Sequence, residues 1–255
     1  MINKENKEVL AIGAHPDDME QFAGGTLILL KRAGYNITIA PLTDGACGSK
    51  ELAAEEIISI RQKEAQKAAK SIGAKYRNLN IPDGCVSYDL ETARKVAGLI
   101  RDVDPLIIIT HPFEDYMSDH YHTGWLVRWA VPEAGHPNFQ AESDAPAIKG
   151  MPYVYRTDPQ GLKDDNGQLV YASTIVDISD VIKKKLHAFA LHKSQMSFLP
   201  GGEIGTVEKT RRWAIMRGQQ VKIAYGEGFR QLRLEEYPSN NILQDILGNE
   251  RVFNL

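Results

Sequence analysis

The chain contains 255 residues, of which 43% are hydrophobic and 25% charged, and its formal net charge is -3. This composition is typical of a globular protein and excludes a disordered chain, a collagen and a coiled coil. Its 30 basic and 33 acidic residues give no positive excess for a nucleic-acid partner. Two cysteines are too few for a disulfide framework, and no apolar run approaches the roughly 20 residues of a membrane span. We therefore expect a cytoplasmic protein.

The first half of the chain alternates apolar strand-like runs with helical segments. Strands are predicted at 8–13, 36–42, 76–81 and 105–110, and helices at 22–32, 53–72 and 90–101. Repetition of strand and helix in this way predicts parallel pairing with right-handed crossovers. We therefore expect an α/β fold with a doubly wound, mostly parallel sheet and helices on both faces.

The second half is less regular. It contains a predicted helix through 125–129, a strand at 153–156, a strand at 170–176, a helix at 180–193 and the start of a further helix at 208–216. The strand at 153–156 lies within a long segment, 132–166, that is rich in Pro, Gly and Asp, and such segments are often functional. Because no repeat or linker divides the chain, we expect one domain over 1–255 with an elaborated C-terminal part.

Two loops that directly follow predicted strands carry histidines and carboxylates. In an open α/β sheet, ligands bind beyond the carboxyl ends of the strands, where these loops lie. His15 and Asp18 are three residues apart on a turn and can converge on one cation, with a third ligand from the loop that begins at His111. Two histidines and one carboxylate are a recurrent catalytic zinc site, although other divalent metals also accept them. Asp17 would then be available as a general base. The alternative is a polar turn in which Asp18 caps a helix.

A series of short motifs extends this pattern along the chain. They begin with Ala14-His15-Pro16-Asp17-Asp18-Met19-Glu20 and continue in order at 24–27, 42–45, 61–65, 81–84, 110–112, 119–120, 192–195 and 225–230. Together these residues resemble the PIG-L/LmbE family of zinc-dependent N-acetylglucosaminyl deacetylases. The resemblance implies a Rossmann-like single domain, a divalent metal that is usually zinc, and hydrolysis of an N-acyl group from an amino sugar.

Position by position, the resemblance implies that His15, Asp18 and His120 bind the metal and that Asp17 is the general base. The chain departs from the family pattern at Met117, where the family has a histidine thought to stabilise the oxyanion or protonate the leaving amine. A thioether can do neither. Asp17 can serve as both base and acid, or a histidine elsewhere can compensate; the candidates, in order of preference, are His192, His111 and His122.

Four further residues are candidates for the site, and three of them have an alternative interpretation. Asp119 is expected to accept the ring N–H of a metal-binding histidine, or to cap a helix. Arg61 is three residues before Glu64, which is typical of a surface ion pair, whereas the resemblance implies that Arg61 reaches the substrate. Asp44 and His111 follow strands and are expected to contact substrate, although a turn function also explains Asp44.

The resemblance implies an enzyme that removes the N-acetyl group from an N-acetylglucosamine-type sugar or its conjugate. One alternative is an amidase acting on a larger N-acyl sugar conjugate, with a pocket widened by the 132–166 segment. The other is a sugar-binding protein that retained the metal and lost turnover with the change at Met117. The expected partner is a small amino-sugar molecule, and family members are often homo-oligomers.

Overall fold

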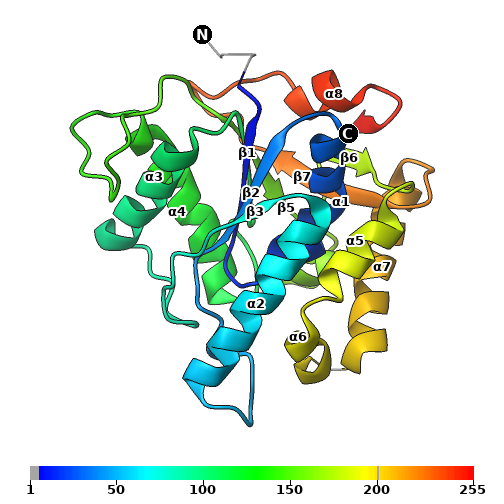
Figure 1. The fold of residues 1–255 in the computed structure, drawn as a ribbon. Coiled ribbons are helices and arrows are strands. Elements are labelled where there is room, and N and C mark those ends of the chain that lie inside the picture. Colours follow the sequence, from blue (N-terminus) through cyan, green and yellow to red (C-terminus); the bar gives the residue numbers. More distant parts are fainter. Residues whose placement is uncertain (1–5, 200) are drawn as a thin grey trace.

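The computed structural model describes residues 6–199 and 201–255 and is built around one eight-stranded sheet (Figure 1). The strands lie in the order β3-β2-β1-β4-β5-β7-β6-β8. Their bounds are β1 (Glu8–Gly13), β2 (Asn36–Pro41), β3 (Lys75–Tyr76), β4 (Ile107–Thr110), β5 (Tyr153–Thr157), β6 (Thr174–Asp177), β7 (Gly226–Gln231) and β8 (Val252–Asn254). The first five strands pair in parallel, and β7, β6 and β8 continue the sheet with antiparallel pairing. The expected mostly parallel α/β fold is confirmed.

Helices cover both faces of this sheet. They are α1 (Asp18–Arg32), α2 (Ala54–Ile72), α3 (Leu90–Val103), α4 (Ser118–Ala134), α5 (Ile182–Phe189), α6 (Lys193–Phe198), α7 (Gly202–Gln220) and α8 (Ile242–Leu247), with a short 3-10 turn at Gln160–Leu162. Figure 1 shows α3 and α4 on one side of the sheet and α1, α5 and α7 on the other. Within the described parts of the chain, no helix has both the length and the apolar character needed to cross a membrane.

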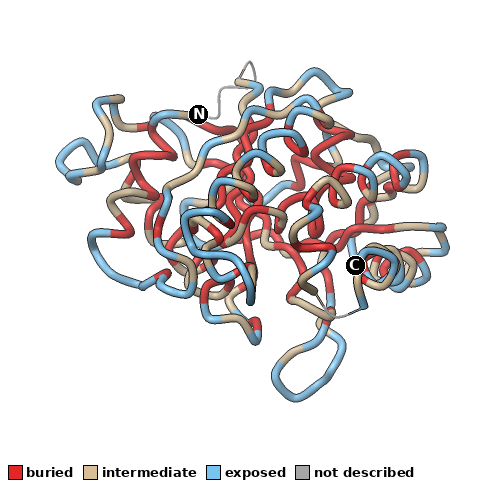
Figure 2. Tube along the Cα trace, turned by 60° about the horizontal axis from the view of Figure 1, so that its bottom comes forward, coloured by how far each residue is buried: buried red, intermediate tan, exposed pale blue. Residues whose placement is uncertain are grey.

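Two apolar cores separate on the two sides of the sheet because side chains alternate along each strand. In β1, Val9 and Ala11 belong to the core beneath α1, whereas Leu10 and Ile12 belong to the core beneath α3 and α4. The buried residues accordingly follow the sheet through the middle of the molecule (Figure 2). β1 is buried on both faces, and the residues of the turn after it are buried or half-buried.

The structure differs from several predicted boundaries. The strand expected at 76–81 is only β3 followed by an isolated bridge between Thr43 and Ile81, because Asn78 and Asn80 form local side-chain hydrogen bonds that interrupt pairing. The helix expected to end at Lys193 stops at Phe189, and α6 begins at Lys193. Pro132 does not start a loop but lies inside α4.

A buried ion pair joins β7 to α5, and the carboxylate of this pair also contacts α1. The carboxylate of Glu227 on β7 accepts hydrogen bonds from the amides of Gly25 and Thr26, at 2.8 and 2.7 Å, and from Lys185 Nζ at 2.6 Å. Both charged side chains are 3% exposed. This contact fixes α1, and with it the turn that precedes α1, against β7.

Removing one partner of this pair should cost far more than removing a surface pair. Glu227→Ala leaves the Lys185 ammonium buried without its carboxylate, so we expect a loss of about 3–5 kcal/mol in the free energy of unfolding. Glu91→Ala, which removes an exposed pair with Lys95 on α3, should cost about 0.5 kcal/mol or less. Denaturant unfolding monitored by circular dichroism measures both; equal losses would show that the buried pair does not hold α1.

Candidate active site

Three side chains from two loops converge at the carboxyl edge of the sheet. His15 and Asp18 lie where β1 turns into α1, and His120 lies in the first turn of α4, after β4. Because β1 and β4 are parallel neighbours, their carboxyl ends place these loops side by side. His120 Nε2 lies 3.4 Å from Asp18 Oδ1, and His15 Nδ1 lies 3.5 Å from Asp18 Oδ2. One ligand atom from each of the three residues lies within 4.8 Å of the others.

Carboxylates stand behind both histidines. His15 Nε2, the nitrogen facing away from Asp18, lies 3.2 Å from Asp83 Oδ1 and 3.5 Å from Asp119 Oδ2. His120 Nδ1 lies 3.2 Å from Asp115 Oδ2. Carboxylates in this position fix the tautomer and the ring orientation of a metal-binding histidine. Asp119 therefore lies where it can have its expected supporting role, while Asp83 and Asp115 were not singled out from the sequence.

The alternative readings of Asp119 and Asp18 as helix caps are wrong. Met117 is the N-cap of α4, and the Asp119 carboxylate instead accepts hydrogen bonds from the amides of Gly84 and Val86. Asp18 Oδ2 accepts a hydrogen bond from the amide of His15, so Asp18 holds the turn in which it lies.

His111 contacts this cluster from within the protein. Its ring is completely buried, its Nε2 donates to Asp18 Oδ2 at 2.9 Å, and it stacks on His120 with ring centroids 4.0 Å apart. This hydrogen bond leaves Asp18 Oδ1 facing His120. The geometry gives His111 a supporting contact with Asp18; its expected contact with substrate stays a prediction.

The electrostatics of the cluster suit a cation. Burial opposes protonation of His15, but hydrogen bonds with Asp119, Asp18 and Asp83 outweigh it and place its pKa well above 6.5. Burial likewise lowers the pKa of His120, yet the charge of Asp18 and the contact with Asp115 raise it to about 9. Positive charge is thus stabilised at both rings.

A buried ring nitrogen also tests whether a metal fits. His120 Nε2 is shielded from solvent and has no hydrogen-bond partner in the described residues, although it points toward Asp18. A buried polar atom without a partner is unfavourable unless a ligand satisfies it. The imidazole nitrogens and carboxylate oxygen are donors that zinc and related divalent metals accept. His15, Asp18 and His120 therefore fit a divalent metal.

Asp17 lies beside this set and has an unusual backbone. Its φ of 136° is in a region that residues with a side chain rarely adopt, and such strain clusters at functional sites. Burial raises the pKa of Asp17 to about 6, while the Arg61 guanidinium, 3.7 Å from the carboxylate, opposes the rise. The strained turn thus holds a carboxylate of elevated basicity next to the candidate ligands.

Arg61 is a buried residue of the site. Its guanidinium donates to the carbonyl oxygens of Gly45 and Pro16, both at 3.0 Å, and lies 3.7 Å from carboxylate oxygens of Asp17 and Asp83. It therefore connects the loops after β1 and β2 and neutralises part of the charge around Asp17. Whether Arg61 also reaches substrate stays a prediction.

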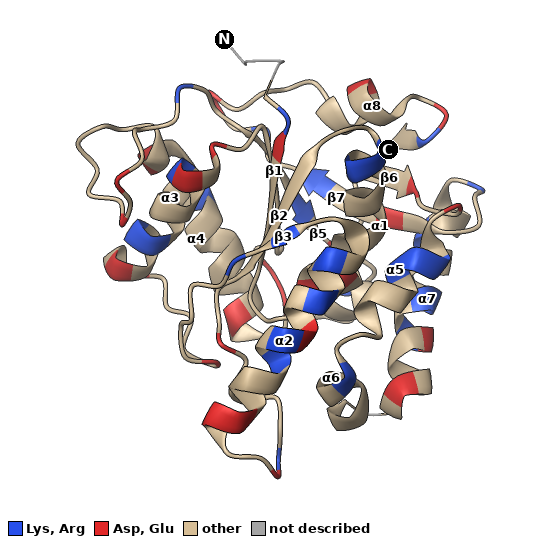
Figure 3. Ribbon diagram, viewed as in Figure 1, with Lys and Arg blue, Asp and Glu red and all other residues tan. Residues whose placement is uncertain are grey.

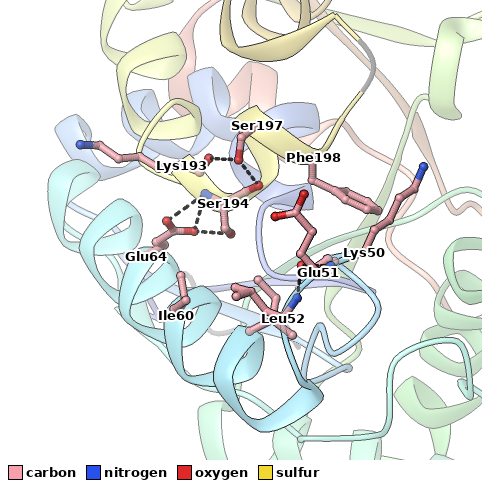
Figure 4. Close-up of a pocket in the computed structure, with 12 residues that line it drawn as sticks. Lys50, Glu51, Leu52, Ile60, Glu64, Lys193, Ser194, Ser197 and Phe198 are labelled. Carbon is pink, nitrogen blue, oxygen red and sulfur yellow. Dashed lines mark hydrogen bonds between the residues drawn. The ribbon is translucent and has the colours of Figure 1, made fainter.

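The reading of Arg61 and Glu64 as a surface ion pair is wrong. Glu64 turns toward α6, where its carboxylate accepts hydrogen bonds from the amide and the hydroxyl of Ser194, as Figure 4 shows. These residues border a pocket of about 560 Å³ between α2 and α6. The residues that line this pocket do not include His15, Asp18 or His120. The pocket is therefore separate from the His/Asp cluster.

The remaining sequence candidates have other surroundings. His192 is completely buried, with Nε2 3.7 Å from Glu20 Oε1, so its ring has to be uncovered before it can contact a substrate. His122 Nδ1 donates to the Val86 carbonyl at 2.7 Å. The Asp44 carboxylate accepts a hydrogen bond from the amide of Ala46 in its own turn, which is the turn function that the sequence allowed, and another from the amide of Asp83 in a separate loop.

Comparisons with known proteins identify relatives of this chain. The family model described as PIG-L: GlcNAc-PI de-N-acetylase matches residues 10–131. Diacetylchitobiose deacetylase of Thermococcus kodakarensis is 32% identical over an alignment of 200 residues. The alignment covers 74% of this chain and 70% of that protein. 4-oxalmesaconate hydratase of Pseudomonas putida is 27% identical over 251 residues, 91% of each. The solved N,N'-diacetylchitobiose deacetylase from Pyrococcus horikoshii has a TM-score of 0.77 at 28% identity and covers 90% of this chain and 85% of that chain.

Proposed function

The chain belongs to the PIG-L family, and from that membership we propose that it hydrolyses the N-acetyl group of an N-acetylglucosamine-type sugar or its conjugate. One observation carries the proposal. His15, Asp18 and His120 converge beside Asp17, whose backbone is strained and whose carboxyl pKa is raised to about 6. A deacetylase needs these two parts, a metal site and a carboxylate that takes a proton from water.

We propose that His15, Asp18 and His120 hold the metal, with zinc as its identity. When bound, such a metal polarises the acyl carbonyl and lowers the pKa of water. Asp17 accepts the proton of the water that attacks the carbonyl carbon, and a pKa of about 6 leaves it ionised at neutral pH. Cleavage of the C–N bond then yields acetate and a free amine. The amine takes up the proton from Asp17, whose carboxylate Arg61 orients.

Two residues can donate the proton to the leaving amine, His192 and Asp17. Met117 occupies the position of the family histidine. His192 is proposed as its replacement, acting from beside Glu20 once its ring is uncovered. Transfer by Asp17 alone needs no such movement and uses only groups that already lie at the site.

Restoring the missing imidazole should increase turnover. We expect Met117→His to raise kcat for acetate release about 10-fold, less than the 10²–10⁴ of a complete general acid, because Asp17 already transfers the proton. Met117→Leu is the matched control, since it keeps the volume of the side chain without an ionisable group. Acetate release by both metal-loaded variants measures the effect, and equal rates would exclude an acid function for an imidazole at this position.

A panel of N-acetylglucosamine conjugates tests the proposal itself. Acetate and free amine should appear together, in equal amounts, with metal content measured on the same sample. Release of longer acyl groups from conjugates in the panel would identify an amidase with wider specificity. Binding of the sugars without release of acetate or amine from any conjugate would favour the sugar-binding alternative and contradict the hydrolase.

A second candidate function is hydration in the manner of the 4-oxalmesaconate hydratase relative. Two observations favour it: the likeness spans 91% of both chains, and Met117 provides no acid for a leaving amine. Asp17 could accept the proton of water in either reaction. Incubation with unsaturated carboxylic acids and detection of the mass of one added water distinguishes the two reactions.

We further propose a cytoplasmic enzyme that acts on small molecules without a nucleic-acid partner and assembles as a homo-oligomer. Light scattering coupled to size-exclusion chromatography measures the assembly state.

A further inference from the structure

Two arginines face each other across neighbouring strands. Arg156 on β5 and Arg230 on β7 are direct partners in the antiparallel register. Side chains paired in this way lie on the same face of the sheet, and like charges directly opposite one another are unfavourable. Figure 3 also shows a basic residue on β7, in the sheet, and not only on the outer helices. With Arg128 of α4, these two residues form what we call the arginine cluster.

The guanidinium groups of the cluster have unsatisfied donors. Arg156 Nε, Arg230 Nε and one terminal nitrogen of Arg230 are shielded from solvent and have no hydrogen-bond partner in the described residues. Burial, together with the charges of Arg230 and Arg128, lowers the pKa of Arg156 to about 10. The protein therefore holds positive charges close together and leaves several of their N–H groups unused.

Aromatic rings contact two of the three guanidinium groups, those of Arg128 and Arg156. Arg156 Cζ lies 4.2 Å from the centroid of Phe113, and Arg128 Cζ lies 5.6 Å from Phe113 and 5.0 Å from Trp125. Rings attract the flat face of a guanidinium, so the N–H groups at its edge remain available to an acceptor. Phe113 belongs to the loop that also carries His111 and Asp115, which connects the cluster to the candidate active site.

The neighbouring acids do not balance these charges. Glu114 acts electrostatically on both Arg156 and Arg230, but no ion pair within 4.0 Å joins it to either residue in the described chain. Asp158 also acts on Arg230, yet its two carboxylate oxygens accept hydrogen bonds from Arg217 at 2.7 and 2.6 Å. Unused donors and an excess of positive charge thus occur together.

We propose that Arg128, Arg156 and Arg230 form a binding site for an anionic oxygen group, either a carboxylate or a phosphate. Such groups match the edge of a guanidinium with two parallel hydrogen bonds. The anion would satisfy the buried donors and separate the two like charges across β5 and β7. The anion is either a substituent of the substrate or a free ion. The first of these alternatives rests on the proposed function.

Titration with inorganic phosphate and with malonate, at constant ionic strength, tests the site without any turnover. Both anions should raise the Tm of the wild-type protein. Arg230→Gln should raise the Tm in the absence of anion, because it removes the repulsion with Arg156, and should weaken anion binding at least about 10-fold. Arg230→Lys keeps the charge and should retain part of the response. Arg212→Gln, at an exposed position on α7, should behave as the wild type.

The opposite result would overturn the site. If the cluster only stacks on Phe113 and Trp125, Arg230→Gln lowers the Tm or leaves it unchanged in the absence of anion, and its response to phosphate and malonate equals that of the wild type. If Arg230→Gln instead lowers the Tm and also abolishes the response, isothermal titration with Arg230→Lys decides between loss of structure and loss of the site. Partial anion binding by Arg230→Lys and its absence for a folded Arg156→Gln support the site; binding at the wild-type affinity in both excludes it.

Kinetics then identify the source of the anion. Conjugates of N-acetylglucosamine with a carboxylate or phosphate on the aglycone are compared with neutral conjugates of similar size. For a substrate substituent, Arg230→Gln should raise KM for the anionic conjugates about 10-fold with little change in kcat and leave the neutral ones unaffected. If the anion is a free ion, Arg230→Gln should leave KM unchanged for both the anionic and the neutral conjugates. The anion titrations of the variant and the wild type should still differ. Absence of turnover with every conjugate would contradict the proposed function and leave the titrations valid.

Discussion

Asp17→Asn is expected to reduce acetate release by about 10²–10⁴-fold while the protein keeps its metal. The amide has the shape of the carboxylate but cannot accept a proton from water. Asp17 lies next to the proposed ligand Asp18, yet its own carboxylate faces Arg61 at 3.7 Å, so its loss should leave the proposed metal site intact. Turnover of metal-loaded protein and metal content of the same sample are the two measurements.

The control for this variant addresses the strained backbone. Asn tolerates unusual backbone conformations nearly as well as Asp, so Asp17→Asn should unfold at the same denaturant concentration as the wild type. A folded, metal-loaded variant with wild-type turnover would show that Asp17 is not the base. Loss of metal together with activity would instead assign Asp17 to the ligand set.

His120→Ala is expected to remove both the metal and the activity. This residue contributes Nε2 to the proposed site from α4, whereas His15 and Asp18 come from the turn between β1 and α1. Its loss leaves only two protein ligands, whereas catalytic zinc sites commonly have three. We expect no bound metal after dialysis and no acetate release above background. Treatment of the wild-type protein with a chelator should have the same effect, reversed by zinc.

Neighbouring variants make this test specific. His122→Ala, two residues further along α4, removes a ring that binds the Val86 carbonyl and should keep the metal. Asp115→Asn removes the carboxylate behind His120 and should weaken metal affinity about 10–100-fold, an intermediate effect. Metal content measured by mass spectrometry orders the three variants, and full metal occupancy in His120→Ala would exclude the proposed ligand set.

Local sequence patterns predicted the parallel half of the fold. The continuous apolar run at 105–110 indicated a strand, and the structure confirms it as β4 (Ile107–Thr110). The long segment at 53–72 indicated a helix, and α2 (Ala54–Ile72) has that end, with Gly73 as its C-cap. The antiparallel half was less visible, because glycines obscure the alternation in β7 (Gly226–Gln231) and its partners are distant in the chain.

The same distinction holds for the candidate site. His15, Asp17 and Asp18 lie on one short turn, so their proximity follows from the sequence, and the resemblance to the PIG-L/LmbE family added His120. Asp83 belongs to the motif at 81–84 and Asp115 lies in the loop after β4, yet neither carboxylate was assigned a role, since an aspartate in a loop is most often solvated. Only the folded chain places them against ring nitrogens.

The sequence likewise determined only part of the charge distribution. A net charge of -3 excludes a strongly basic surface, but it does not say where individual charges meet. Arg156 and Arg230 are separated by 74 positions and become neighbours through strand pairing, while Arg61 turns away from Glu64 toward Asp17. Residue type and local spacing settled the chemistry of the candidate ligands and the class of the fold. The partners of each buried charge depended on tertiary packing, because burial brings together groups that local periodicity does not relate.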